Sequence, residues 1–462
     1  MTDAATASPD LEPLRSQVSG KVSGPEDRDW DEARQAWNLA VDQRPVAVVF
    51  ATGADDVAAT VRFAAGAGVR VTAQGSGHAA SSHDTLADTI LIKTNEMTGL
   101  EIDAGNRTAR VEAGVLAGDL SAQAGEHGLA PLGGSSADVG VVGYTLGGGL
   151  GWLGRLYGFA SNAVRSVEIV TADGELVRAD AGEQPDLFWA VRGGGGSFGI
   201  VIALDVNLVP LGELFAGGVM YDVEHAPAVF RAYRDWARQA PAELTSSVRF
   251  LTPPPIPDVP EPIRGRPMVV VTGAHAGDPA EGEQLFAPMR ELAEPVMDMF
   301  GAVPPAALCR INGDPENPVP GIGGRSIVIA DLSDEAIDAL VALCGAGSGS
   351  PLLTVDLRHL GGALAEAPEG AGVLGSLEGE FAIAAVGVPM GPNTPEAITG
   401  HLDKLYDGLE PFSTGGTYLN FTEVPSDGST AFGEDAQAEL RRIKAELDPD
   451  RVIRGGRDVG PG

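Results

Sequence analysis

Three clusters of glycine, at residues 75–77, 133–151 and 193–199, constrain most strongly what this chain can fold into. The middle cluster alone contains eight glycines. Glycine lets the backbone turn sharply and lie close against another body. Loops of this kind can point successive backbone N–H groups at one anion, because no side chain stands in the way. The clusters therefore indicate a phosphate-bearing ligand, with ordinary tight turns as the alternative.

Two familiar phosphate-binding motifs do not explain these clusters. A P-loop requires a Gly-Lys-Ser or Gly-Lys-Thr triplet, and the sequence has neither. Residues 149–154, GLGWLG, do fit the G-x-G-x-x-G pattern of dinucleotide-binding folds. That pattern belongs between the first strand and the first helix of its domain. The match here lies further along the chain and places the bulky Trp152 in the turn, so it is weak.

Strand and helix patterns alternate from Arg44 to Pro210. Apolar runs predict strands at RPVAVVF, VRVTAQ, TILIKT and TARVEAG, and helical periodicity appears in DDVAATVRFAAGAG and AGDLSAQAGEHGL. VRSVEIVTADGELVRA predicts a hairpin that turns at residues 172–174. Before this region, a helix is expected around residues 30–37.

Beyond Pro210 the pattern changes to strands joined by proline-rich linkers. The predicted strands are SSVRFL, MVVVTGAH, RSIVIADL, LLTVDLRHL and FAIAAVGVP, with helices such as DEAIDALVAL between them. This order favours an antiparallel sheet covered by helices. Near the end of the chain we expect helices at PEAITGHLDKLYDGL and AQAELRRIKAELDPD, with a strand at TYLNFTEV between them.

Charge and cysteine content exclude several classes of partner. The chain has 31 Lys and Arg against 64 Asp and Glu, a formal net charge of −33. Nucleic-acid binding requires basic clusters, and an anionic membrane would repel such a protein, so we expect neither partner. No leader-like segment or long apolar span is evident, which favours a cytoplasmic protein. Cys309 and Cys344 fit no disulfide framework, and no histidine spacing predicts a metal site.

Four stretches together carry a family resemblance: GSGH at 75–78, SSADVGVVGYTLGGGLGWLGRLYG at 135–158, DLFWAVRGGGGSFGIV at 186–201 and TYLNF at 417–421. Their order and spacing resemble the berberine bridge enzyme-like FAD-linked oxidoreductases, of the p-cresol methylhydroxylase and vanillyl-alcohol oxidase class. The tail RRIKAELDPDRVIR matches as well. The resemblance covers nearly the whole chain.

This resemblance implies an α+β fold. A two-subdomain FAD-binding domain of the p-cresol methylhydroxylase type would be joined to a substrate domain with an antiparallel sheet covered by helices. The expected parts are a lead-in at 1–40, the FAD-binding domain at 41–210, the substrate domain at 211–400, and a C-terminal segment at 401–462 that returns to the FAD-binding domain.

The resemblance also assigns a role to His78. In the family, a histidine after the first Gly-x-Gly is bonded covalently to the flavin 8α-methyl carbon. A neutral imidazole is available near pH 7 for such a bond. Some members attach the flavin a second time, through a cysteine in the second loop. Ser136 stands at that position here, and a hydroxyl is a poorer nucleophile than a thiolate. We therefore expect one covalent link, through His78, and a surface position for His83.

Further site residues are carried over by position. The expected cofactor contacts are Gly75, Ser76, Gly77, Ser135, Ser136, Val139, Gly140, Gly143, Gly147, Gly148, Gly149, Gly199, Val201 and Asn420. Tyr144 stands where the family often has a histidine or tyrosine near the flavin pyrimidine edge. Three positions depart from the family pattern: Gln74, Ser197 and the tail VIRGG.

Tyr418 matches the first tyrosine of the family's Tyr-x-Asn-Tyr pattern, which makes it the candidate catalytic base, with Tyr144 as the second candidate catalytic residue. Phe421 replaces the second tyrosine of that pattern. A tyrosine has an ordinary pKa near ~10, so neighbours must favour its anion for it to act as a base. Packing against the flavin is the alternative role for Tyr418. Of Arg358 and His359, strand alternation allows at most one to face the flavin.

The expected function is that of an FAD-dependent oxidoreductase. It would transfer a hydride from a small organic substrate, such as an alcohol, a sugar or a secondary metabolite, to flavin N5. Molecular oxygen is the expected acceptor, which makes the protein an oxidase. A dehydrogenase with another acceptor, or a flavin-binding protein without turnover, are the alternatives. The sequence leaves the substrate and the oligomeric state open.

Overall fold

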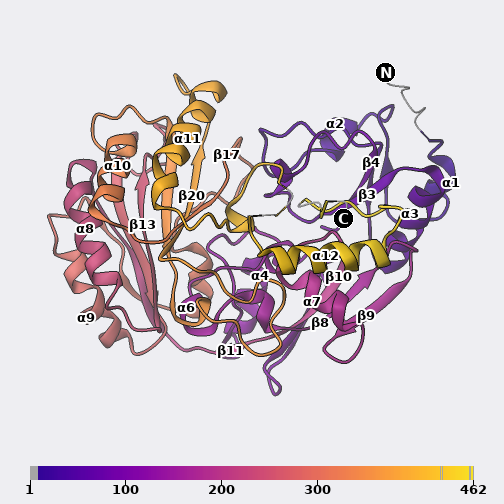
Figure 1. Cartoon of the computed structure of the whole chain (residues 1–462), viewed down its shortest axis with the longest axis horizontal. Coiled ribbons are helices and arrows are strands. Elements are labelled where there is room, and N and C mark those ends of the chain that lie inside the picture. Colours follow the sequence, from indigo (N-terminus) through magenta and orange to yellow (C-terminus); the bar gives the residue numbers. More distant parts are fainter. Residues whose placement is uncertain (1–8, 427, 429, 457–458, 461–462) are drawn as a thin grey trace.

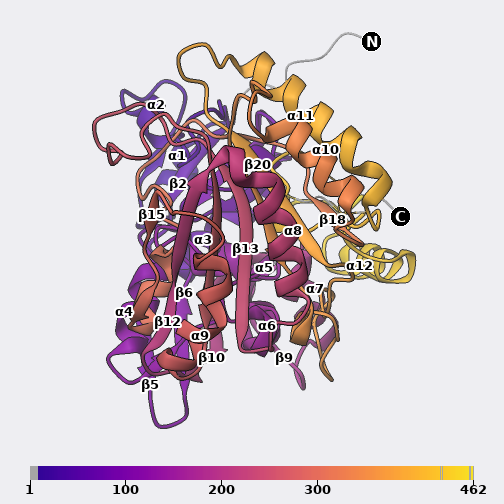
Figure 2. The ribbon, with the colours of Figure 1, turned by 90° about the vertical axis from the view of Figure 1, so that its left-hand side faces the viewer.

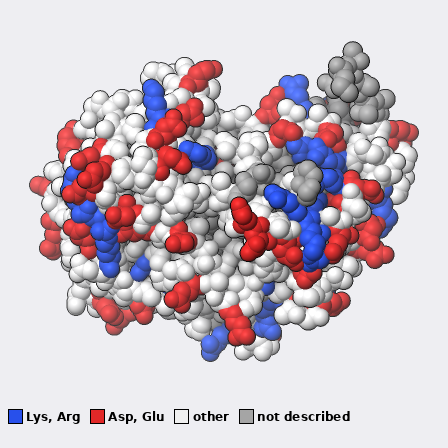
Figure 3. All heavy atoms as spheres, in the orientation of Figure 1, with Lys and Arg blue, Asp and Glu red and all other residues white. Residues whose placement is uncertain are grey.

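The computed structural model describes residues 9–426, 428, 430–456 and 459–460, so the first eight residues of the expected lead-in lie outside it. The chain forms two lobes (Figure 1). Both ends of the chain belong to the lobe on the right of the view, and the middle of the chain forms the other lobe. A face of the molecule with acidic and basic side chains interspersed is shown in Figure 3.

The first sheet of the right-hand lobe is built around a β-α-β unit. Strand β2 leads into helix α3 (Ala54–Ala67), which ends at Gly68 with a φ of 68°. That left-handed conformation suits glycine. The helix returns the chain to β3, and β4 pairs in parallel with both β2 and β3. In spatial order the strands are β1 (Val22–Ser23), β2 (Ala47–Phe50), β4 (Thr89–Lys93) and β3 (Arg70–Gln74).

The second sheet of this lobe is antiparallel. Its strands in spatial order are β5 (Leu100–Asp103), β6 (Thr108–Glu112), β10 (Ile200–Asn207), β8 (Val164–Val170) and β9 (Leu176–Asp180). The predicted hairpin is confirmed, because β8 and β9 pair directly and Gly174 in the turn has a φ of 77°. Strands β7 (Leu129–Ala130) and β11 (Val209–Pro210) form a separate antiparallel pair. In the chain, β11 follows directly after β10. The helices of this region are α4 (Ala117–Gly125), α5 (Val141–Leu146), α6 (Gly154–Tyr157) and α7 (Pro185–Gly194).

The other lobe is built on a large antiparallel sheet, in which the described residues form nine strands. They are β12 (Leu214–Asp222), β13 (Leu244–Leu251), β14 (Met268–His275), β15 (Met297–Asp298), β16 (Gly301–Val303), β17 (Ile322–Gly323), β18 (Ile327–Ile329), β19 (Leu352–His359) and β20 (Phe381–Gly387). The helices are α8 (Ala226–Ala237), α9 (Pro279–Arg290), α10 (Asp334–Cys344) and α11 (Pro395–Leu409). Figure 2 shows these helices in front of the strands. The apolar sides of α8, α10 and α11 form one core with the sheet, so the predicted antiparallel sheet covered by helices is confirmed.

The end of the chain returns to the first lobe. Helix α12 (Glu434–Leu447) packs against α7, and Ile453 then forms a parallel bridge with Val71 of β3. The helix ends where Asp448 and Pro449 follow, as the sequence predicts. In the described part of the chain, no helix combines the length and apolar character needed to cross a membrane.

Two local predictions are wrong. The helix expected around residues 30–37 is confined to α2 (Trp30–Ala33), and Trp37 lies beyond its end with its ring stacked on His78. The strand expected at 417–424 is instead a 3₁₀ turn at Leu419–Phe421. Tyr418 N–H donates to Ser326 Oγ, and Phe421 N–H bonds back to Tyr418 O, so no strand partner takes these groups.

Candidate functional site

A cavity of about 430 Å³ lies where the glycine loops meet, within the 300–1,000 Å³ range of small-molecule sites. The walls come from distant parts of the chain: residues 72–83, the loop from 134 to 150, residues 195–201, the 3₁₀ turn at 418–423, and Gly455 and Gly456. Arg358 of β19 is the wall residue from the other lobe. The site is therefore assembled by tertiary structure and not by one local motif.

The cavity brings together most of the site residues expected from the sequence. Its lining includes Gly75, Ser76, Gly77, His78, Ser135, Ser136, Val139, Gly140, Gly143, Tyr144, Gly147, Gly199, Val201, Tyr418 and Asn420. Gly148 and Gly149 lie behind the wall, with φ values of 109° and 79°. A Cβ on either would come within 2.5 Å of Leu374 or Ala160. These two glycines serve the backbone turn and its close packing, so the structure does not place them among the cofactor contacts.

His78 is held in the cavity wall by three neighbours. Its ring stacks on Trp37, with centroids 3.9 Å apart and the planes 22° from parallel. The Ser76 hydroxyl shares a 2.8 Å hydrogen bond with His78 Nδ1. His78 Nε2 lies 3.5 Å from Asp138 Oδ1, and Trp37 Nε1 donates to the other oxygen of Asp138 at 2.5 Å. The imidazole is thus oriented before any ligand is bound.

This surrounding keeps His78 neutral. Burial lowers the pKa of His78 to about 4, although the Asp138 carboxylate acts in the opposite direction. The ring therefore presents a neutral imidazole across the physiological pH range, and a neutral nitrogen is the nucleophilic form.

Tyr418, Asn420 and Tyr144 form a second cluster in the cavity. Leu150 N–H donates to the Tyr418 hydroxyl oxygen at 2.8 Å, and Asn420 Nδ2 lies 3.2 Å from the same oxygen. Asn420 Nδ2 also donates to Tyr144 O at 2.8 Å. Donors that converge on one oxygen favour its anionic form.

Burial acts in the opposite direction, because it favours the neutral form of both the Tyr418 and the Tyr144 phenol. It raises the pKa of Tyr418 above its ordinary value, while the hydrogen bonds from Leu150 and Asn420 lower it by less. Burial also raises the pKa of Tyr144. The Tyr144 hydroxyl has no hydrogen-bond partner among the described residues, so it can bond to a ligand.

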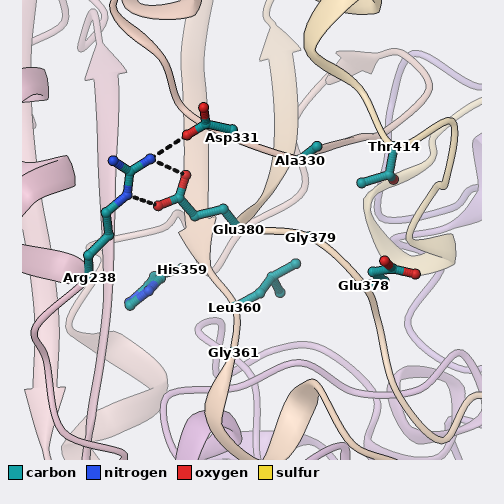
Figure 4. Close-up of a pocket in the computed structure, with 10 residues that line it drawn as sticks. All are labelled: Arg238, Ala330, Asp331, His359, Leu360, Gly361, Glu378, Gly379, Glu380 and Thr414. Atoms are coloured by element: carbon teal, nitrogen blue, oxygen red, sulfur yellow. Dashed lines mark hydrogen bonds and ion pairs between the residues drawn. The ribbon is translucent and has the colours of Figure 1, made fainter.

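Arg358 and His359 lie on opposite faces of β19, as strand alternation predicts. Arg358 lines the cavity, with its guanidinium 4.1 Å from the centre of the Trp152 ring. His359 lines a different groove, where Arg238 bridges Asp331 and Glu380 (Figure 4). Burial, reinforced by the nearby Arg155 guanidinium, lowers the pKa of His359 to about 3. Of the two residues, only Arg358 can contact a ligand in the cavity.

The residues of the cavity fit FAD. Four lining side chains have a buried polar atom without a partner among the described residues: Gln74 Oε1, His78 Nε2, Tyr144 Oη and Arg358 Nε. Gly143, Gly195 and Gly196 present backbone with no atom within 4 Å of the position of a Cβ, so a phosphate can approach the main chain closely. A polar, elongated cofactor suits a cavity that combines bare backbone with unpaired polar side chains.

Sequence reasoning missed several residues of the site. Trp37 and Asp138 are 101 positions apart, and no spacing signal links them to His78. His83, expected on the surface, is half-buried and lines the cavity. Gly455 and Gly456 of the unusual VIRGG tail line it as well. Among the described residues, no cluster of His, Cys, Asp and Glu side chains is arranged to hold a metal ion.

Comparisons with known proteins agree with this geometry. Residues 45–180 match the FAD binding domain family. The chain is 25% identical over 456 residues to the protein named "Uncharacterized FAD-linked oxidoreductase YgaK" of Bacillus subtilis (strain 168), covering 97% of this chain and 98% of that protein. The chain is an FAD-linked oxidoreductase, and its fold resembles that of a berberine bridge enzyme-like protein.

Two further comparisons concern a named oxidase and a solved structure of the same overall fold. The chain is 34% identical over 212 residues to (R)-6-hydroxynicotine oxidase of Paenarthrobacter nicotinovorans, covering 46% of each chain. The crystal structure of 6-hydroxy-D-nicotine oxidase from Arthrobacter nicotinovorans superposes with a TM-score of 0.83 at 23% identity, covering 98% of this chain and all of that one. The expected fold class, a two-subdomain FAD-binding domain joined to a substrate domain, is confirmed.

Proposed function

We propose that this FAD-linked oxidoreductase holds its flavin covalently through His78 and oxidises a small organic molecule, with molecular oxygen as the electron acceptor. The observation that carries the proposal is the joint placement of a neutral, oriented imidazole and a buried phenol with converging donors in one cavity. The bound flavin supplies an acceptor for a hydride at N5. The remaining chemistry belongs to the side chains of the chain itself.

His78 is the proposed attachment residue. Its neutral ring is positioned by Trp37 and Ser76, and Asp138 lies where it can take the proton from Nε2. His78 would then hold the flavin through a C–N bond to its 8α-methyl carbon, and molecular oxygen would accept the two protons and two electrons released. Ser136, at the position of the second attachment in some relatives, bonds Asp314 through its hydroxyl, which fits a single link.

Tyr418 is the proposed base that takes the proton from the substrate. Tyr418 lines the cavity, and its oxygen accepts hydrogen bonds that favour the phenolate. Tyr144, with its unpaired hydroxyl, would bond the cofactor. The remaining cavity residues would contact the cofactor mainly through backbone, as their glycine content indicates.

An oxidase is favoured over a dehydrogenase with another acceptor, because the relative with 34% identity is named as an oxidase. Rapid mixing decides between them: photoreduced enzyme should reoxidise in air-saturated buffer within seconds, and reoxidation over many minutes would favour the dehydrogenase.

A cytoplasmic location is supported by the two buried free cysteines, which are typical of a reducing compartment.

The covalent link predicts a yellow protein after acid precipitation. Its mass should exceed that of the polypeptide by one FAD less two hydrogen atoms. His78→Ala should release free FAD on denaturation, because the nitrogen proposed for the attachment is then missing. His127→Ala, at an exposed histidine, should stay yellow. A colourless wild-type pellet would contradict the link.

The lowered pKa of His78 predicts how attachment depends on pH. A histidine that titrates near 6.5 would lose roughly nine-tenths of its neutral form at about pH 5.5. With the pKa of His78 lowered to about 4 by burial, the neutral form persists there. Apo-protein mixed with FAD should therefore gain covalent flavin at nearly equal rates at pH 7.5 and 5.5. A roughly tenfold slower rate at the lower pH would show that His78 titrates normally.

A further inference from the structure

The large sheet has two faces of opposite character. On β13 and β19, valine, leucine and phenylalanine side chains belong to the core beneath α8, α10 and α11. Because side chains alternate along a strand, the residues between them face the other way. These are Ser247 and Arg249 on β13, and Asp356 and Arg358 on β19. That face looks toward the FAD-binding lobe, since Arg358 lies against the ring of Trp152.

Strand register brings these side chains together. Ser247 pairs with Arg358, and Arg249 pairs with Asp356, across β13 and β19. On the other side of β13, Thr272 of β14 pairs with Ser247. Directly paired residues have side chains in contact range. The five residues form one polar patch, the name used below for Ser247, Arg249, Thr272, Asp356 and Arg358.

The polar patch is buried and only partly hydrogen-bonded. None of its five residues is more than 8% exposed. In the described structure one atom of each lacks a hydrogen-bond partner: Ser247 Oγ, Arg249 Nε, Thr272 Oγ1, Asp356 Oδ1 and Arg358 Nε. Buried polar atoms in folded proteins are nearly always paired. Arg358 is the patch residue that lines the cavity, so a ligand there would supply the missing partner of its Nε.

The chemistry of the polar patch indicates what that molecule carries. A guanidinium can only donate, a carboxylate can only accept, and a hydroxyl can do either. Its two guanidinium groups give the patch a surplus of hydrogen-bond donors, while one aspartate beside each arginine balances the charge. Arg249 already has Asp314 at 3.9 Å, toward the exposed rim. The charge partner of Arg358 is Asp356, through one hydrogen bond of 3.3 Å.

Arg358 is also the member of the polar patch that lines the cavity, together with Tyr418. Stacking on Trp152 holds the plane of its guanidinium. A planar guanidinium with free N–H groups matches a carboxylate in a two-bond arrangement.

We infer that the substrate is an organic anion and that Arg358 binds its carboxylate, with Asp356 orienting the guanidinium. This inference rests on the proposed function, because it assigns the substrate of the same cavity. It makes Arg358 the residue that selects charged over neutral substrates.

The test compares matched acids and amides on the flavin-loaded enzyme. Benzoate against benzamide, and butyrate against butyramide, differ in charge but hardly in size. Binding is followed by the change in flavin visible absorbance, without turnover. Wild type should bind at least one acid roughly 10- to 100-fold more tightly than its amide, as expected for bonds to a charged group. Arg358→Gln should bring acid and amide to equal affinity, whereas Arg358→Lys should keep part of the preference.

Arg44→Gln, at an exposed arginine, is the matched control and should behave as wild type. Equal affinity for acid and amide in wild type would overturn the inference, and so would an acid preference that survives in Arg358→Gln. The wild-type comparison stands even where Arg358→Gln does not fold. A preparation that takes up no flavin would instead contradict the proposed function, so the two failures are distinguishable.

Discussion

Replacing Tyr418 with phenylalanine is expected to slow reduction of the bound flavin by substrate about 100-fold or more, the range that general-base catalysis contributes. The phenol ring is almost fully buried, at 1% exposure, and packs 4.9 Å from the centre of the Phe421 ring. The substitution removes one oxygen and keeps this packing. The flavin should therefore still be bound, with its absorbance spectrum nearly unchanged.

The same variant tests the protonation state of Tyr418. Because burial raises the pKa of Tyr418 above its ordinary value, the phenolate is the minor form at neutral pH. In wild type the rate of flavin reduction should therefore rise as the pH is raised through the alkaline range. In Tyr418→Phe that rise should disappear, because no group remains to titrate at this position.

Stopped-flow absorbance under anaerobic conditions gives the reduction rate directly. Tyr157→Phe is a suitable control, since Tyr157 is 40% exposed and outside the cavity lining. A rate in Tyr418→Phe within about threefold of wild type, with the rise at high pH retained, would remove Tyr418 from the role of base.

Lys444→Met should destabilise the protein by about 3–5 kcal/mol, the usual effect of removing one partner of a buried ion pair. Lys444 and Asp448 each have 1% exposure, and Lys444 Nζ donates to Asp448 Oδ2 at 2.6 Å. Without the lysine, the carboxylate of Asp448 would stay buried with its charge uncompensated.

The ion pair also fastens the end of the chain to the site. Lys444 Nζ donates to Ser197 O in the third glycine loop and to Ile453 O in the tail. Asp448 in turn accepts from the backbone N–H groups of Val452 and Ile453. Loss of the pair should therefore loosen Gly455 and Gly456 and weaken retention of flavin before the covalent bond forms.

Urea unfolding followed by tryptophan fluorescence measures this effect. Lys404→Met, at an exposed lysine, should change the unfolding free energy by less than about 0.5 kcal/mol. The double variant Lys444→Met/Asp448→Leu should be more stable than Lys444→Met alone, since it leaves no buried charge. If Lys444→Met lowers the free energy of unfolding by less than about 1 kcal/mol, the ion pair does not contribute substantially to stability.

The parts of the fold that could be predicted are those encoded locally. The strand Ala47–Phe50 and the helix Ala54–Ala67 follow from a short apolar run and a helical repeat closed by Gly68. The glycine loops predicted a phosphate-bearing ligand because closely spaced glycines leave successive backbone N–H groups open to an anion. These signals need no knowledge of distant residues.

The parts that could not be predicted depend on long-range contacts. Residues 417–424 alternate like a strand, yet the Ser326 hydroxyl and neighbouring backbone groups take the hydrogen bonds that a strand would need. Nothing in the sequence pairs Trp37 with Asp138 or marks Lys444 as buried within an otherwise charged helix. The family resemblance located His78 and Tyr418, but the environment that sets their pKa values comes only from the folded chain.

The walls of the cavity have a consequence for biosynthesis. They include residues from Thr72 to Gly456, so the cavity has all its walls only once residue 456 has been synthesised. A nascent chain stalled before Asp448 would have its glycine loops but no closing tail. Complete closure around the cofactor therefore requires Gly455 and Gly456 to be in place, and these are the last of the lining residues to be synthesised.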